Sequence, residues 1–206
     1  MNKIKHSVIF FITFVFLMSG LTFTKSAFAE KSFANFNDKG QLIRPTGYRE
    51  WIYIGAPLTP NDMNNGKAAF PEFHNVYIDP VSWSYWKTNG VFRNGTIIIK
   101  ELVSVGSKAA ASGKGYFMGE YIGLEAMVKD TKRFNASDRY WGFFRFTKEG
   151  HPTESKNSLL KTSKVNKSES CASCHGANSK QDMVFTQYYP VLRAAKARGE
   201  KGTGGK

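Results

Sequence analysis

The segment Cys171–Ala172–Ser173–Cys174–His175 restricts what this chain can become more than any other segment, because it matches the pattern Cys-x-x-Cys-His. This pattern is the attachment signature of a c-type haem. Both thiols can bond to vinyl groups of the porphyrin, and the histidine can bind the iron. Two thiols three positions apart lie about one helical turn from each other, which suits neighbouring vinyl groups. The motif therefore predicts one covalent haem c, with His175 as the proximal iron ligand.

Two other kinds of site use a similar pair of cysteines. A zinc site would need a second pair of ligands, and the chain has only 2 cysteines. A redox-active dithiol or a small local disulfide usually belongs to a thioredoxin-like alternation of strands and helices, and the sequence shows no such alternation. The cysteine count and spacing therefore favour haem.

The N-terminus has the features of a signal peptide. Lys3 and Lys5 provide a basic start, residues 8–23 are almost wholly apolar, and Ala27–Phe28–Ala29 is a small-x-small cleavage pattern. The apolar run is short for a membrane span and ends at the processing site. We therefore predict that residues 1–29 are removed, that the mature protein is periplasmic, and that it has no membrane span after processing.

The remaining residues are enough for one domain with a sizeable core. We predict a single haem-binding domain over 30–192, followed by a flexible, basic, glycine-rich tail over 193–206. The net charge of +13 includes three lysines of the signal peptide. No basic stripe with a nucleic-acid motif occurs, so we expect no nucleic-acid partner. The tail is either a solvated chain end or a charged segment that steers an acidic redox partner.

Local signals predict several strands and one well-marked helix. Asp79 as N-cap, Pro80 at the first helical position and Gly90 after the last turn predict a helix over 80–89. A helical pattern over 182–198 is interrupted or kinked by Pro190. Apolar, aromatic and β-branched residues predict strands over 48–54, 70–78, 95–106, 116–128 and 140–147.

Strands that follow one another with turn-rich links are typical of an antiparallel meander. The predicted fold class is α+β, a predominantly antiparallel β-sheet with a few helices. A long polar loop over 148–170 leads into the motif, so the C-terminal segment holds the haem.

The strand over 95–106 contains a lysine in an apolar setting. Side chains alternate between faces, so Lys100 lies between Ile98 and Leu102 on one face, while Glu101 lies among apolar residues on the other. A lysine is seldom buried without a partner. Its stem can lie along apolar surface with the ammonium in water or paired with a carboxylate. Alternatively, it is a buried amine made reactive by desolvation.

The second axial position of the iron decides between electron transfer and ligand binding. A second strong ligand would make an electron carrier, and an open position would allow ligand binding or catalysis. No candidate occurs in a pattern that marks it as a ligand. The candidates are Met63, Met118, Met127, Met183, His74 and His151.

Several runs together carry a family likeness. RPTGYREWIYIGAPLTPNDMN, AFPEFHNVYIDP, GTIIIKELVSVGS, GYFMGEYIGLEAMVKD, CASCH and VFTQYYPVLR resemble the cytochrome P460 family over residues 44–192. The resemblance implies a single c-type haem bound through Cys171, Cys174 and His175. It also implies an additional covalent bond from Lys100, in IIIKEL, to a meso carbon of the porphyrin. Lys100 would then be both a cofactor-binding and a catalytic residue.

The resemblance also implies a function. Family members oxidise hydroxylamine to nitrous oxide or nitric oxide at an iron whose sixth position is open, and they pass electrons to a soluble cytochrome. They are homodimers with a largely antiparallel sheet. Each oxidation releases protons, so a nearby carboxylate would serve as a base. We expect most carboxylates to be solvated, so the sequence does not identify this base. The candidates are Glu101, Glu120, Glu125, Glu154, Glu169 and Asp182.

Two alternatives remain open. The chain also resembles the cytochrome c′-beta group, which shares the fold, lacks the lysine bond and binds nitric oxide or carbon monoxide without turnover. The presence of Lys100 favours the enzyme over this group. A simple electron carrier with a methionine or histidine as sixth ligand is the other alternative, and it predicts low-spin iron that ignores both hydroxylamine and nitric oxide.

Overall fold

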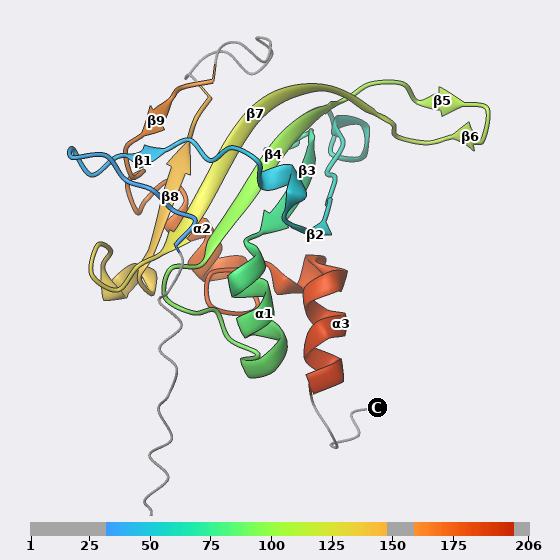
Figure 1. The fold of residues 1–206 in the computed structure, drawn as a ribbon. Helices are drawn as coiled ribbons and strands as arrows, with labels where there is room; N and C mark the ends of the chain where they lie inside the picture. The colour runs from blue at the N-terminus through green and yellow to red at the C-terminus, as the bar shows by residue number, and fades with distance from the viewer. Residues whose placement is uncertain (1–31, 148–158, 200–206) are drawn as a thin grey trace, which may run out of the picture.

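The main sheet of the computed structural model, which describes residues 32–147 and 159–199, has five antiparallel strands (Figure 1). Their order is β2-β3-β4-β7-β8. The strands are β2 (Ile52–Gly55), β3 (Phe73–Ile78), β4 (Ile97–Val105), β7 (Met118–Lys129) and β8 (Trp141–Arg145). Each strand pairs with the next along the chain once the hairpin between β4 and β7 is set aside. The predicted α+β class with an antiparallel meander is confirmed.

Two small two-stranded sheets accompany the main sheet. Strand β1 (Leu42–Ile43) pairs with β9 (Thr162–Ser163), which ties the N-terminal segment to the chain just before the motif. Strands β5 (Ala109–Ala110) and β6 (Gly113–Lys114) form a hairpin that projects from the far ends of β4 and β7 (Figure 1). The glycine-rich connection expected between the two long strands is therefore itself a short β-ribbon.

Helix α1 (Pro80–Asn89) has the predicted bounds because its end signals are local. The buried Asp79 carboxylate accepts a hydrogen bond from the backbone N–H of Ser82 at 2.8 Å, which satisfies a free donor of the first turn. The other carboxylate oxygen accepts from the N–H of Ile97 at 3.0 Å. At the other end Gly90 has φ 65° and donates to Trp86. Asp79 thus fixes the start of α1 against the start of β4.

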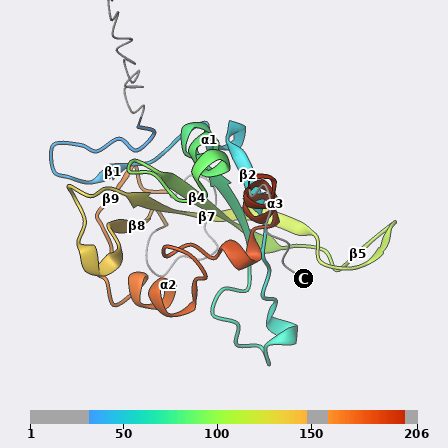
Figure 2. The ribbon, with the colours of Figure 1, turned by 90° about the horizontal axis from the view of Figure 1, so that it is seen from below.

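Apolar residues cover both faces of the sheet, as the pattern of β4 predicts. Ile98 belongs to a cluster with α1, α2 (Ala172–Asn178) and α3 (Pro190–Gly199). Ile97 and Ile99 belong to a second cluster, covered by aromatic residues of the N-terminal segment. Figure 2 shows that this segment and α2 lie on opposite sides of the sheet. The motif therefore packs against the face to which Lys100 points.

The C-terminal helix begins later than expected. The helical pattern was predicted from residue 182, but Asp182 and Met183 lie in a tight turn, and a 3-10 helix, η4 (Thr186–Tyr188), follows. Pro190 starts α3 instead of kinking it, because a first-turn proline loses no helical hydrogen bond. The helix continues to Gly199, past the expected domain boundary at Leu192, whose carbonyl accepts from Trp86 at 3.0 Å.

The strand expected over 48–54 is shorter than predicted. Its first residues form a 3-10 helix, η1 (Tyr48–Glu50), after Gly47 at φ 69°, and β2 begins at Ile52. Two further 3-10 helices, η2 (Asn61–Met63) and η3 (Ala136–Asp138), lie in the expected turn regions. Residues 1–31, 148–158 and 200–206 lie outside the described part, and with them the predicted signal peptide, half of the polar loop and the end of the tail. Within the described part, no helix has the length and apolar character that crossing a membrane requires.

Candidate haem site

The motif occupies the short helix α2, whose N-cap is Cys171. Cys171 and Cys174 are free thiols, with Cys171 half-buried and Cys174 exposed. The amide of Asn166 donates to the sulfur of Cys171 at 3.4 Å. The amide of Asn178 donates to the backbone carbonyl of Cys174 at 2.9 Å. The two sulfurs therefore lie one turn apart on a helix whose polar neighbours orient them.

His175 is the best-fixed side chain of the motif. Its ring lies between Phe143 and Phe185, each with a ring centroid 4.7 Å away. Its Nδ1 lies 2.7 Å from the carbonyl oxygen of Met183. A carbonyl only accepts, so Nδ1 carries the proton and Nε2 keeps its lone pair. Burial lowers the pKa of His175, which keeps the ring neutral. A neutral imidazole with a free Nε2 and an anchored Nδ1–H is the arrangement expected of an iron ligand.

Lys100 lies on the sheet face against which the helix of this histidine packs. In the register of the sheet it pairs with Glu125 of β7, and its Nζ lies 2.6 Å from a carboxylate oxygen of Glu125. The other oxygen of Glu125 lies 2.9 Å from the guanidinium of Arg145. Nζ also lies 4.7 Å from the ring centroid of Phe70. The lysine is 24 % exposed and Glu125 is 18 % exposed, so the pair is mostly removed from solvent.

Glu125 is ionised in spite of its burial. Burial alone would raise the pKa of this carboxyl group, but the charges and hydrogen bonds of Lys100 and Arg145 outweigh burial and hold the pKa below its ordinary value. We expected Glu125 to be a surface carboxylate, and this prediction was wrong. The sequence showed the alternation along each strand, but it did not show which residue of β7 lies beside Lys100.

His74, one of the candidate axial ligands, also lies on this face. It lies on β3 opposite Leu102, and therefore on the same side of the sheet as Lys100. Its Nε2 is buried and has no hydrogen-bond partner among the described residues. Burial, followed by the charge of Lys100, lowers the pKa of His74 to about 4. The nearest carboxylate, that of Glu72, lies 3.9 Å from this nitrogen, and burial raises its pKa.

The Lys100–Glu125 pair acts electrostatically on histidines of two different elements. The charges of Lys100 and Glu125 act on His175 as well as on His74, although the two histidines come from α2 and β3. The sheet thus brings a lysine, a carboxylate and a neutral imidazole to the face against which the motif packs. The buried, unpartnered nitrogen of His74 on the sheet, together with His175 and two free thiols on α2, fits a large ligand held between sheet and helix, as a haem would be.

Glu101 points to the opposite face, as the alternation predicts, but it is not solvated. It is 2 % exposed, and it accepts hydrogen bonds from Tyr48 at 2.5 Å and from Nε of Arg49 at 2.8 Å. The expectation of a surface carboxylate was wrong here because η1 folds over this face. Glu101 and the haem face are separated by the sheet.

The other candidates are distributed as follows. Glu120 and Glu169 are exposed, as expected, and Asp182 pairs with Lys129. Of the possible axial ligands, Met63 is 75 % exposed, whereas Met127 and Met183 are buried in the cluster beneath α2. Met118 is half-exposed. His151 and Glu154 lie outside the described residues.

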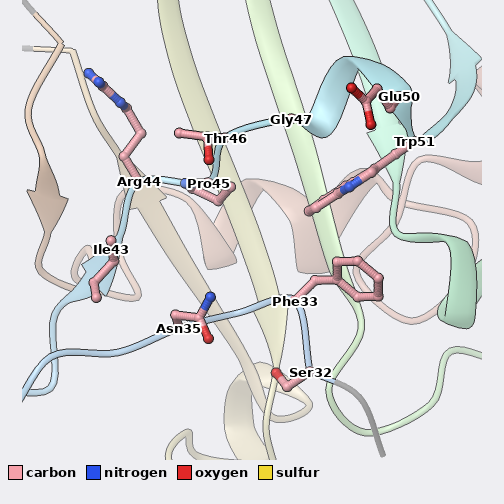
Figure 3. Close-up of a pocket in the computed structure, with 10 residues that line it drawn as sticks. All are labelled: Ser32, Phe33, Asn35, Ile43, Arg44, Pro45, Thr46, Gly47, Glu50 and Trp51. Atoms are coloured by element: carbon pink, nitrogen blue, oxygen red, sulfur yellow. The ribbon is translucent and has the colours of Figure 1, made fainter.

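A separate cavity of about 430 Å³ lies in the N-terminal segment (Figure 3). Phe33 and Trp51, which line it, belong to the layer over the face of Glu101. Arg44 reaches away and donates to the carbonyl of Leu159 at 2.9 Å. None of the residues predicted to bind haem lines this cavity. The lining residues are Ser32, Phe33, Asn35, Ile43, Arg44, Pro45, Thr46, Gly47, Glu50 and Trp51.

Comparison with known proteins agrees with this geometry. No curated protein sequence matches the chain. A family model described as cytochrome P460 matches residues 45–186, a segment that runs from before β2 to η4 and contains Lys100, both cysteines and His175. The match covers more than half of the chain. The chain therefore belongs to the cytochrome P460 family, haem proteins of the hydroxylamine-oxidising kind that carry a covalently bound haem c.

Proposed function

We propose that this protein is a periplasmic enzyme that oxidises hydroxylamine to nitrous oxide or nitric oxide at a haem linked to Cys171, Cys174 and Lys100. The observation that carries the proposal is the placement of Lys100 and Glu125, 2.6 Å apart, on the sheet face that packs against the motif helix. An electron carrier needs neither an amine nor a base at its haem. An oxidase that releases protons needs a base to accept them, and in this family's chemistry an amine would bond to the porphyrin.

The residues of the motif would hold the group in three ways. The thiols of Cys171 and Cys174 would form thioether bonds, and Nε2 of His175 would bind the iron. The hydrogen bond from Nδ1 to Met183 keeps the ring in the required tautomer and orientation. When bound, the haem supplies a redox-active iron that accepts electrons from the substrate.

Lys100 supplies the feature that separates an oxidase from a gas-binding relative. Its Nζ is the atom that would bond to a meso carbon of the porphyrin. The β4 register opposite Glu125 fixes the approach of the amine, and the ring of Phe70 closes one side. A bond at this position would distort the ring and change its electronics, which are two ways in which a protein tunes a haem.

Glu125 is the proton acceptor that we propose for the reaction. It is ionised, mostly buried, and held by Arg145 at a fixed position beside Lys100. A carboxylate in this position can take up protons as hydroxylamine loses electrons. His74 stays neutral above about pH 4 and presents an unpartnered nitrogen to the same space. It can hydrogen-bond a small polar ligand such as hydroxylamine.

A gas-binding protein of the cytochrome c′-beta kind is the second candidate. The ion pair between Lys100 and Glu125 is compatible with this function too, because an ammonium paired with a carboxylate is satisfied without a covalent bond. The two candidates differ in one chemical bond, so they can be separated directly. For either candidate we propose a homodimer, and for the oxidase we also propose a soluble cytochrome as electron acceptor.

The test compares Lys100→Ala with Lys114→Ala, produced in a host that attaches c-type haem. Lys114 lies exposed on the projecting hairpin and serves as a matched control. The wild type and Lys114→Ala are expected to have a strongly red-shifted Soret band after dithionite reduction, and a mass that lacks the hydrogens lost in a third bond. Lys100→Ala is expected to show an ordinary ferrous c-type spectrum. The same spectrum in all three proteins would reject the lysine bond and leave the gas-binding function.

A further inference from the structure

The turn that follows the motif helix has an unusual backbone. Residues 181–184 reverse the chain, with mutual backbone hydrogen bonds between Gln181 and Val184 at 2.8 and 3.4 Å. The two central residues, Asp182 and Met183, have φ 48° and 64°. Positive φ at both central positions is typical of type I′ turns, in which glycine, asparagine and aspartate are usual. A methionine there is uncommon and must be held by its surroundings.

This turn delivers the carbonyl oxygen that His175 uses. The Nδ1 of His175 lies 2.7 Å from the oxygen of Met183, the second central residue. The direction of that carbonyl depends on the left-handed backbone of the turn. A change of this residue to extended backbone would rotate the carbonyl away from the imidazole. The strained turn therefore maintains the hydrogen bond on the proximal side of the predicted haem.

An ion pair ties the turn to the sheet. The Nζ of Lys129, the last residue of β7, lies 2.7 Å from the carboxylate of Asp182, the first central residue. Lys129 is 15 % exposed and Asp182 24 % exposed. The same Nζ lies 5.3 Å from the ring centroid of Trp141, and it donates to the carbonyl of Arg139 at 3.3 Å. The lysine is thus held on three sides and fixes the turn to a rigid strand.

We propose that the Lys129–Asp182 ion pair is a positioning device that sets the strength of the His175–Met183 hydrogen bond and, through it, the reduction potential of the haem. The proposal rests on the proposed binding of iron by His175. An imidazole that donates to a carbonyl is the stronger electron donor to a metal. It stabilises the oxidised iron, and its loss raises the reduction potential.

Three variants separate positioning from simple charge effects. Removing the negative charge in Asp182→Asn raises a nearby potential by Coulomb's law alone, and removing the positive charge in Lys129→Met lowers it. The double variant keeps the net charge. If the pair acts by positioning, all three variants raise the midpoint potential of the holoprotein. We expect a shift of about tenfold in the oxidation equilibrium, which is 59 mV for one electron.

A second measurement reads the hydrogen bond itself. The iron–histidine stretching frequency of the ferrous protein, measured by resonance Raman spectroscopy, falls when the imidazole loses its acceptor. We expect a lower frequency in all three variants and wild-type values in Lys129→Arg, which keeps the ion pair. The variants Lys108→Met and Asp62→Asn remove an ion pair that is largely exposed beside the hairpin, and they should leave both readings unchanged.

Each outcome decides the proposal. The proposal would be overturned by a simple charge effect. In that case the midpoint potential shifts in opposite directions in the two single variants, the double variant has the potential of the wild type, and the stretching frequency is unchanged. If Lys129→Met does not fold, the stretching frequency of Asp182→Asn decides alone. A wild-type protein whose haem lacks histidine ligation would refute both this inference and the proposed attachment. Normal ligation without any shift in the variants would refute the inference alone.

Discussion

Replacing Glu125 by glutamine should abolish most of the hydroxylamine oxidation and leave the cofactor in place. Glutamine has nearly the same volume as glutamate, and its one carbonyl oxygen can still accept a hydrogen bond from either Lys100 or Arg145, which contact different oxygens of the carboxylate at 2.6 and 2.9 Å. It cannot take up a proton. General-base catalysis contributes about 10²- to 10⁴-fold. The turnover rate should fall by that factor, which corresponds to an increase of roughly 3–5 kcal/mol in the activation free energy.

The assay is the hydroxylamine-dependent reduction of an artificial electron acceptor, followed at saturating hydroxylamine. Glu120→Gln is the matched control, because it removes the same charge from an exposed position of the same strand. The reduced spectrum and the mass of both variants must show an intact cofactor. A rate for Glu125→Gln within about threefold of the control, less than 1 kcal/mol, would refute the role of Glu125 as proton acceptor.

The role of Glu125 as a base also predicts how the rate of the wild type depends on pH. A carboxylate base loses activity as the pH falls through its pKa. Burial raises the pKa of Glu125, and the charges of Lys100 and Arg145 lower it. A bond from Lys100 to the porphyrin turns the ammonium into an uncharged amine, so the pKa rises in the mature protein. The acidic limb of the rate profile should therefore lie at higher pH than the ion pair alone would give, and it should be absent in Glu125→Gln.

Two further predictions concern stability. The pKa of His74 is about 4 in the folded protein, against 6.5 for an unperturbed histidine, so the unfolded state binds an extra proton between these pH values and stability falls as the pH falls through this range. Urea unfolding should show a loss of about 2 kcal/mol between roughly pH 7 and pH 5 that His74→Leu removes, and an equal loss in that variant would contradict the burial of a neutral imidazole. Asp79→Ala should cost about 3 kcal/mol, because the buried N–H groups of Ser82 and Ile97 lose their acceptor. The exposed Asp38→Ala is its control, and a loss below about 1 kcal/mol would show that water replaces the cap.

Features with local causes could be predicted from the sequence. The bounds of α1 followed from Asp79, Pro80 and Gly90, because a cap acts within one turn of the helix. The inward direction of Lys100 followed from the two-residue period of β4. The start of α3 was missed, because Pro190 fits equally well at a kink or at a first turn, and only packing against α1 distinguishes these.

The partner of Lys100 could not be predicted, because it depends on contacts between distant strands. The register of β4 on β7 is set across a connection that itself forms a hairpin, and it includes irregularities near Leu102 and Val103. A shift of one residue would have placed Leu124 or Ala126 opposite Lys100 instead of Glu125. His74 was named as a candidate axial ligand, but its position near Lys100 could not be predicted for the same reason, since it arises from the pairing of β3 with β4. An alignment of strands by charge complementarity was the one signal that could have suggested Glu125.

The neighbouring residues Lys100 and Glu101 make the alignment of β4 specific. Lys100 pairs with Glu125 on one face of the sheet, and Glu101 accepts hydrogen bonds from Arg49 and Tyr48 on the opposite face. A slip of the strand by one residue exchanges the two faces. A slip in one direction would place the carboxylate of Glu101 opposite Glu125, and a slip in the other direction would place the ammonium of Lys100 at the position that faces Arg49. In either case the misaligned strand would bring like charges together and would present no amine to the porphyrin. Only a correctly aligned strand could form the lysine bond, and the covalent bond would then make that alignment permanent.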